Sequence, residues 1–235
     1  MDSRLFAKQI LMKTENAADA ISKELQDRPT LDPPALIRTL KAHMWREFSL
    51  GVLPASKQIT LLPPGDVEMK VLLAQQSAEE LLHYQVLAEL IAELGGDPEL
   101  THYEPTEEDI ALYNHTYGPD TLLGITGAFQ VSGEVILIEV LKSLIRIVDK
   151  RMGEVIRDRV LAHEGSHVRN GRLLLERYAT TPEGQAAVEA SVNAMIELRK
   201  KSRREKLYPF SPSPGRGSLV PKAPPAGQGP LFSPL

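Results

Sequence analysis

The sequence has no cysteine and no long apolar run. Without cysteine, none of its 235 residues can form a disulfide, a thiolate metal site or a thiol nucleophile. Because no stretch approaches about 18 uninterrupted apolar residues, no segment is expected to span a membrane. The N-terminus lacks a basic region followed by an apolar stretch, so no secretory signal is expected. These absences leave a cytoplasmic protein as the default expectation.

A strong excess of one charge is missing as well. The chain has 27 Lys and Arg residues against 31 Asp and Glu residues, which gives a net charge of −4. This balance gives no broad electrostatic reason to expect nucleic-acid binding. Hydrophobic residues make up 42% of the chain and charged residues 25%, values that are ordinary for a soluble globular protein. The length allows one domain with a sizeable core.

Apolar residues recur at helical spacing through most of the chain, and no segment shows the alternation of a β-strand. This pattern predicts an all-α fold, with a leading helix over about 3–26, core helices over about 33–52, 66–95 and 120–149, a fourth core helix ending near Tyr178, and a fifth helix starting at Pro182. Breaks are expected at Pro54 and at Pro63-Pro64-Gly65, a long connection over 97–118, and a tight turn at Lys150–Gly153.

The C-terminal segment differs in composition from the rest of the chain. From Leu207 onward it is rich in Pro, Gly and Ser, which predicts no regular structure. We therefore divide the chain into a predicted helical domain over 1–206 and a tail over 207–235.

Two Glu-x-x-His motifs are the most informative pattern. Each lies in a predicted helix and has an acidic residue upstream, by 33 positions in the first half and 30 in the second, which gives the set Glu47, Glu80, His83, Glu134, Glu164 and His167. Positions i and i+3 share one helix face, so the carboxylate and the imidazole of one motif can bind the same metal ion. Two such helices plus two helices that each donate one Glu form the ligand set of ferritin-like di-iron and di-manganese proteins.

Other residues compete for these positions. Glu139 is the alternative to Glu134, but its spacing to the second motif is only 25 positions. Gly133 leaves room for a metal ion or a substrate beside Glu134, so Glu134 is preferred. A third match, Glu99-Leu-Thr-His102, directly follows a helix stop and a turn, and it is interpreted as a coincidence in a loop.

The second motif also fits a zinc-peptidase pattern. In His163-Glu164-Gly-Ser-His167, the two histidines would bind zinc and the glutamate would act as the base. That interpretation leaves the first motif and both upstream acids unexplained, and it lacks a strand that could line a peptide-binding cleft. His163 is instead interpreted as a group that supports the metal ligands from behind.

Small side chains on the third core helix either line a substrate pocket beside Glu134 or allow close helix packing. Both interpretations stay open for Gly127, Ala128, Val131 and Gly133. Two tyrosines, Tyr84 and Tyr113, are further candidates, either for the pocket or for groups that support the metal ligands.

The sequence around these residues resembles the catalytic-subunit family of phenylacetyl-CoA epoxidase, the ferritin-like oxygenases of phenylacetic acid catabolism. The resemblance covers roughly residues 40–200 and lies in Glu47-Phe-Ser-Leu-Gly51-Val-Leu53-Pro54, in Leu72 to His83, in Glu164-Gly-Ser-His167-Val-Arg-Asn-Gly171 and in Ala179 to Gln185. The family has an acid before the Glu of both motifs. Here Glu79 keeps that acid in the first motif, whereas His163 replaces it in the second.

This resemblance implies a ferritin-like four-helix bundle with an extra N-terminal helix and a fifth C-terminal helix. It implies two iron ions, or manganese, on Glu47, Glu80, His83, Glu134, Glu164 and His167, and an oxygenase that uses O₂ to hydroxylate, epoxidise or otherwise oxidise a small organic substrate. Electrons would come from a separate reductase or ferredoxin, since the chain has no cysteine for its own iron–sulfur cluster. A ferritin-type iron-binding or ferroxidase protein is the alternative, and homo-oligomer formation stays open.

Overall fold

A computed structural model describes residues 1–25 and 31–204 of the chain. Within these ranges all regular secondary structure is helical, which confirms the predicted all-α class. No helix in this part of the chain is both long enough and apolar enough to cross a membrane. The predicted end of the leading helix, near residue 26, and the predicted tail over 207–235 lie outside the described residues.

Helices make up most of the described residues. The α-helices are α1 (Ser3–Leu25), α2 (Pro33–Arg46), α3 (Leu53–Leu61), α4 (Val67–Glu93), α5 (Glu107–Tyr117), α6 (Leu122–Thr126), α7 (Val135–Ile147), α8 (Lys150–Ile156), α9 (Ala162–Tyr178) and α10 (Pro182–Arg204). Three π-helical segments, η1 (Glu47–Val52), η3 (Gly127–Glu134) and η4 (Arg157–Leu161), join α-helices end to end, and η2 (Leu100–His102) is a 3₁₀ turn.

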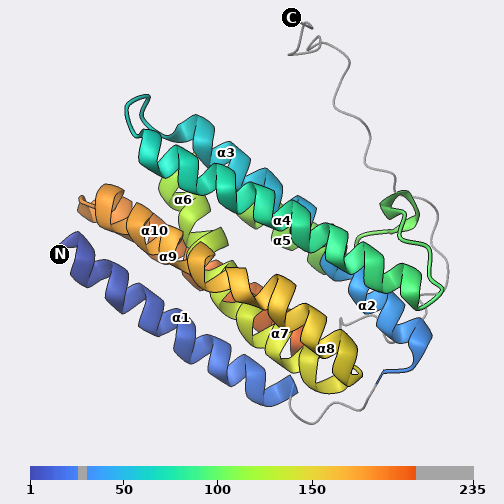
Figure 1. Cartoon of the computed structure of the whole chain (residues 1–235). Helices are drawn as coiled ribbons and strands as arrows, with labels where there is room; N and C mark the ends of the chain where they lie inside the picture. The colour runs from blue at the N-terminus through green and yellow to red at the C-terminus, as the bar shows by residue number, and fades with distance from the viewer. Residues whose placement is uncertain (26–30, 205–235) are drawn as a thin grey trace, which may run out of the picture.

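Four long rods form the centre of the molecule. They are α2-η1-α3, α4, α6-η3-α7 and α8-η4-α9, and each of the three composite rods contains one π-helical segment. The first two rods pack as an antiparallel pair, as do the last two (Figure 1). The connection that carries η2 and α5 links one pair to the other, while α1 and α10 pack on the second pair.

A polar layer divides the interior of the bundle between two apolar regions. On α4, Leu73 belongs to an apolar cluster near one end, together with Leu62, Met69 and Leu174. Leu87 belongs to a larger cluster towards the other end, which α2, α7 and α8 also supply. Between these two clusters, the buried residues of α4 are polar, namely Gln76, Glu80 and His83. The helical register therefore places the first motif in the middle of the bundle, away from both ends.

The structure corrects the predicted break at Pro54. The chain stays helical through this residue to Leu61, because Pro54 lies in the first turn of α3, immediately after η1. A proline lacks the N–H that an interior helical position needs. The hydrogen-bond pattern of the π turn η1 differs from that of an α-helix at this point. The missing N–H of Pro54 therefore does not break the rod.

Two further connections are more helical than expected. The segment 97–118 contains the helix α5, which begins with a capping box between Thr106 and Asp109. Lys150–Gly153 is not a turn but the first part of α8, with Asp149 as its N-cap. The chain reverses just before this segment, at Val148 and Asp149, which are both extended between α7 and α8.

Candidate metal centre

All six predicted ligands lie together in the polar layer of the bundle. The four carboxylates and two imidazoles come from the four rods, and their exposure is at most 3%: Glu47, Glu80, His83, Glu134, Glu164 and His167. Burying a charged carboxylate costs roughly several kcal/mol unless a positive charge or hydrogen bonds compensate it. Four of them at one level of a bundle therefore require a compensating positive charge.

The glutamates of the two motifs lie between the two imidazoles. Glu80 Oε2 is 3.4 Å from His83 Nδ1, and its Oε1 is 3.2 Å from His167 Nδ1. Glu164 repeats the arrangement, with Oε1 at 3.4 Å from His83 Nδ1 and Oε2 at 3.1 Å from His167 Nδ1. Each of these carboxylates thus presents one oxygen to each of two neighbouring positions.

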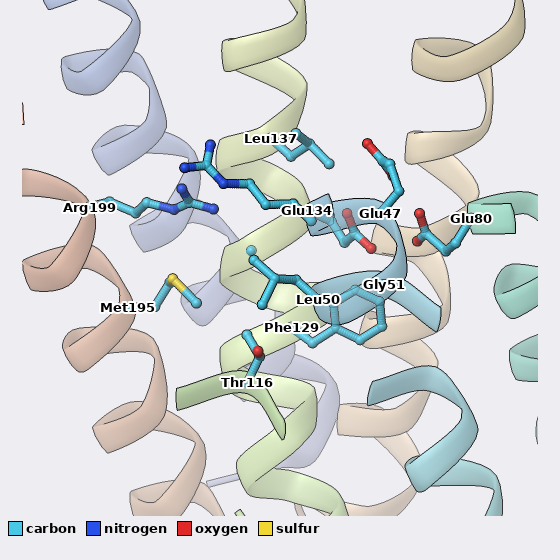
Figure 2. Close-up of a pocket in the computed structure, with 12 residues that line it drawn as sticks. Glu47, Leu50, Gly51, Glu80, Thr116, Phe129, Glu134, Leu137, Met195 and Arg199 are labelled. Carbon is cyan, nitrogen blue, oxygen red and sulfur yellow. The ribbon is translucent and has the colours of Figure 1, made fainter. Parts of the chain in front are cut away.

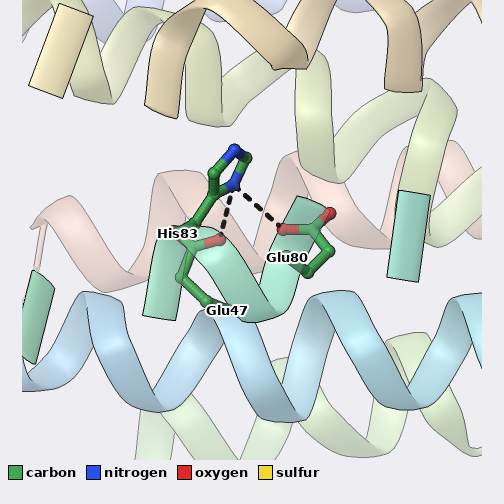
Figure 3. Close-up of side chains that lie close together, drawn as sticks. All are labelled: Glu47, Glu80 and His83. Atoms are coloured by element: carbon green, nitrogen blue, oxygen red, sulfur yellow. Dashed lines mark ion pairs between the residues drawn. The ribbon is translucent and has the colours of Figure 1, made fainter. Parts of the chain in front are cut away.

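The upstream glutamates lie at opposite ends of this arrangement. Glu47 Oε2 is 3.5 Å from His83 Nδ1, and Figure 3 shows it facing that imidazole together with Glu80. Glu134 Oε1 is 3.7 Å from His167 Nδ1. Two groups of candidate ligand atoms result, each within 4.8 Å, and Glu80 is common to both: Glu47, Glu80 and His83 in one, and Glu80, Glu134 and His167 in the other.

The electrostatics of the cluster reflect its burial. Burial raises the pKa of Glu47 to about 8 and that of Glu134 well above its ordinary value, and the Glu80 charge adds to both shifts. Burial alone would lower the imidazole values, but the surrounding carboxylates outweigh it and raise the pKa of His83 to about 10 and of His167 to about 12. Without a metal, protons therefore supply the positive charge that the cluster needs.

The residues fit a pair of divalent cations. Four buried atoms of the cluster have no hydrogen-bond partner, namely Glu47 Oε1, Glu80 Oε1, His83 Nδ1 and Glu164 Oε1. Buried polar atoms are rarely left in this state unless something else satisfies them. Two divalent cations would balance four carboxylates with neutral imidazoles. Oxygen and nitrogen donors without thiolate suit iron, manganese or zinc.

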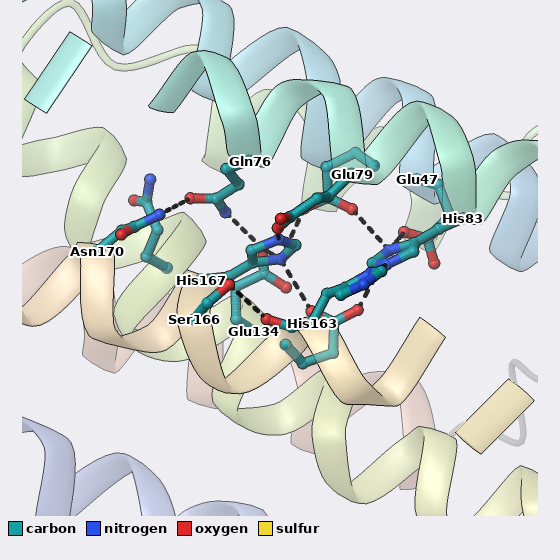
Figure 4. Close-up of polar contacts among 12 residues, drawn as sticks. Glu47, Gln76, Glu79, His83, Glu134, His163, Ser166, His167 and Asn170 are labelled. Carbon is teal, nitrogen blue, oxygen red and sulfur yellow. Dashed lines mark hydrogen bonds and ion pairs between the residues drawn. The ribbon is translucent and has the colours of Figure 1, made fainter. Parts of the chain in front are cut away.

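Polar side chains surround the cluster on the side of α4 and α9. Glu79 Oε2 lies 2.9 Å from His167 Nε2, and His163 Nδ1 lies 3.0 Å from His83 Nε2 (Figure 4). Gln76 donates to Glu134 at 3.1 Å and accepts from Asn170. Gln76 and Asn170 did not stand out in the sequence, because an amide on a helix face carries no motif and its partner is distant in the chain.

The π-helical segments place the upstream glutamates next to glycine. Glu47 and Gly51 lie in η1, and Gly133 and Glu134 end η3. A Cβ at Gly51 would come within 2.7 Å of Glu80 Cδ, so only glycine allows η1 to approach the carboxylate so closely. π-helical turns occur frequently at functional sites. In the sequence, Gly51 stands out only as part of the resemblance, and nothing there indicates its steric role.

A small cavity adjoins the carboxylates on the side of η1 and η3. Its volume is about 40 Å³, enough for about three water molecules. Apolar side chains form much of its wall, and two arginines also line it. These residues are Leu50, Phe129, Leu137, Met195, Arg46 and Arg199. Figure 2 shows Arg199 on the side opposite Glu80. Asp109 pairs with Arg46 at 2.7 Å, and Glu108 lies 3.6 Å from Arg199.

The position of the cavity shows which of the small residues on η3 line a pocket and which allow close helix packing. Gly133 lines it, whereas Ala128 and Val131 are buried in packing. A Cβ at Gly127 would meet the Val188 backbone oxygen at 2.9 Å, so this glycine serves the contact between η3 and α10. Close helix packing therefore explains all but one of the four.

Both tyrosine candidates lie elsewhere. Tyr84 packs against the larger apolar cluster, and Tyr113 stacks on Tyr117 with ring centroids 5.3 Å apart. Neither lines the cavity beside the carboxylates. Their prediction as pocket groups was wrong.

The competing residues also lie away from the centre. Glu139 is half-buried and pairs with Lys142 at 2.6 Å. His102 is in the 3₁₀ turn η2 and pairs with Asp97 at 2.6 Å, on the surface. Among the described residues, the groups that could hold a metal contain His83 or His167 but not His163, so the geometry gives the zinc-peptidase pattern no support.

Comparisons with known proteins leave the family open. No protein-family model matches the chain, and no curated protein matches its sequence.

Proposed function

We propose that this chain is a ferritin-like, dinuclear non-haem iron oxygenase acting on a small organic substrate. The observation that carries the proposal is the pair of motif carboxylates, Glu80 and Glu164, each of which faces both His83 and His167. A bridging carboxylate pair with one further Glu and one His at each end is the ligand pattern of dinuclear carboxylate centres in helix bundles. The two antiparallel pairs with one long connection also suit such a bundle.

In this proposal Glu47 and His83 would hold one iron, Glu134 and His167 would hold the other, and Glu80 and Glu164, which face both imidazoles, would serve both. Bound iron supplies the redox chemistry that activates O₂. The carboxylates balance its charge, and the apolar clusters on both sides keep bulk water from the centre. Manganese fits the same donors.

The cavity favours an oxygenase over a site that only stores iron. It reaches Glu47, Glu80 and Glu134, and its wall is largely apolar. O₂ that enters there would meet the carboxylates from the side of η1 and η3. Oxygenation by O₂ consumes two electrons and two protons for each oxygen atom inserted, and the second oxygen leaves as water. A separate reductase or ferredoxin is the expected source of electrons.

The test combines metal analysis with a reaction of the reduced protein. We expect about two iron ions per chain after anaerobic loading, as four carboxylates balance two divalent cations. Stopped-flow mixing of the di-ferrous protein with O₂ is expected to give a transient visible band, and a true substrate is expected to change its lifetime. A redox-silent metal would give complete inertness to O₂, and a ferritin-type protein would take up many iron ions per chain as mineral. Either result would overturn the proposal.

A further inference from the structure

The residue before each motif contacts the histidine of the other motif. Glu79 precedes Glu80 and lies 2.9 Å from His167 Nε2. His163 precedes Glu164 and lies 3.0 Å from His83 Nε2, with the two rings stacked at an interplanar angle of 9°. The two halves therefore share one design, but the outer partner is a carboxylate in one half and an imidazole in the other (Figure 4).

Metal binding would fix the protons in both contacts. Nδ1 of both motif histidines faces the carboxylates, so a metal there leaves the proton of the neutral imidazole on Nε2. His167 then donates to the Glu79 carboxylate. His83 donates to His163 Nδ1, which requires His163 to carry its own proton on Nε2. A carboxylate makes the ligand it holds more basic, whereas a neutral imidazole adds no charge.

A second difference acts in the same direction. Gln76 donates to Glu134 and is itself held by Asn170, so the carboxylate beside His167 is oriented before an ion binds. Glu47, the corresponding residue beside His83, has an Oε1 without a hydrogen-bond partner. Ordering a ligand in advance lowers the entropic cost of binding.

We propose that the two metal positions are unequal: the position of Glu134 and His167, supported by Glu79 and Gln76, fills first and binds tightly, and the position of Glu47 and His83, supported by His163, binds more weakly and exchanges its ion. This inference rests on the dinuclear centre of the proposed function, but not on its oxygen chemistry. His163 acts in it as a positioning residue that keeps one position weak.

The test is a titration of the metal-free full-length chain with Mn²⁺, followed by calorimetry and electron paramagnetic resonance. In the native protein, one equivalent is expected to give the spectrum of isolated Mn²⁺, and a second equivalent that of a coupled pair. His163→Glu is expected to tighten the second binding step by roughly 10- to 100-fold, the usual effect of such outer partners. Glu79→Gln is expected to weaken the first step by a similar factor.

His163→Gln is the matched control, because its amide oxygen can still accept from His83 without adding charge. It is expected to keep the native pattern, and circular dichroism shows whether each variant is folded. Two equal affinities in the native chain, or a His163→Glu variant that binds no tighter, would overturn the inference while leaving a dinuclear centre. A native chain that binds no metal would instead overturn the proposed function and the inference with it.

Discussion

The two sides of the candidate metal centre are built differently. On the side of α4 and α9, both motif histidines have a polar partner behind them, Glu79 in one case and His163 in the other. On the side of η1 and η3, glycines and a cavity adjoin the upstream glutamates. One side fixes the positions of the ligands, whereas the other leaves space for a second reactant.

Secondary structure explains this division. A regular α-helix repeats one face every three or four residues, so a short motif on α4 or α9 directs both of its ligands to one point. A π-helical turn inserts an extra residue, so the side chains after it point in a different direction. In η1 this turn brings Gly51 against Glu80 of α4. The α-helical segments α4 and α9 thus suit ligand pairs, and the π-helical segments η1 and η3 suit single ligands beside a cavity.

The largest difference is expected between bridging and end ligands. Glu164→Gln removes a carboxylate that faces both metal positions, so we expect it to lose most of both ions. Glu47→Gln removes a carboxylate from one end, so we expect it to keep about one ion per chain. Glu139→Gln, on α7 but paired with Lys142 outside the centre, is the control and is expected to keep two. Metal analysis after anaerobic loading measures all three, and a Glu164→Gln chain that keeps both ions contradicts the bridging role.

A methyl group at Gly51 tests the close approach of η1. Its Cβ would meet Glu80 Cδ at 2.7 Å, so Gly51→Ala is expected to displace this carboxylate and to lower metal content. Overpacking of this kind typically costs about 1–3 kcal/mol. Gly165→Ala is the matched control, because nothing lies within 4 Å of its Cβ, although it stands beside Glu164.

The control makes the Gly51 result specific. Gly165→Ala is expected to keep both ions and to stabilise α9 by up to about 1 kcal/mol, the difference in helix propensity between glycine and alanine. Metal content and thermal unfolding of both variants provide the comparison. Equal metal content in the two would show that the approach at Gly51 has no part in metal binding.

Metal removal is expected to make stability fall with rising pH. In the metal-free protein the pKa of Glu47 is raised to about 8 and that of His83 to about 10. The stability that these groups contribute is therefore complete below their unfolded values, near 4.5 and 6.5, and is lost as pH rises through the folded ones. Each proton involved gives a slope of about 1.4 kcal/mol per pH unit.

Bound metal replaces these protons, so the metal-loaded protein is expected to keep its stability over the same range. The gap between the two melting temperatures then widens from pH 5.5 to pH 8.5. Thermal unfolding with and without a chelator at several pH values measures it, and Glu47→Gln is expected to flatten the metal-free curve. A metal-free protein that becomes more stable towards pH 8.5 contradicts the buried carboxylate cluster.

The sequence allowed good predictions where the geometry is local. The i,i+3 spacing brings Glu80 and His83 to one face, and the apolar residues before and after them place that face inside the bundle. Spacing between the halves then favoured Glu134 over Glu139, and the structure brings Glu134 to the cluster. A periodic pattern on a long helix is sufficient for such inferences.

Other features depend on contacts between distant residues or on irregular backbone. The pairing of Glu79 with His167 joins residues 88 positions apart, and no local pattern marks it. The π-helical segments use the same residue types as α-helices, so η1 and η3 leave no periodic trace. The helix α5 is a different case, since the Thr106 and Asp109 capping box is a local pattern that was overlooked.

The smallest effect on metal binding is expected from a substitution in the wall of the cavity. Leu50 lines it but offers no ligand atom, so Leu50→Ala is expected to enlarge the cavity and to keep two ions per chain. The lost burial costs about 2–5 kcal/mol, as for other leucine truncations in cores. Leu144→Ala is the matched control, since Leu144 is buried in the larger apolar cluster, does not line the cavity and lies ten residues beyond Glu134 on the same rod. Xenon binds enlarged apolar cavities, and Mn²⁺ broadens the resonance of a xenon atom close to it. We expect strong broadening in Leu50→Ala and much weaker broadening in Leu144→Ala, because only the first opens space beside the metal positions. Equal broadening in the two variants would show that the cavity does not lead to the metals, and the side of η1 and η3 would then have no claim to be the substrate side.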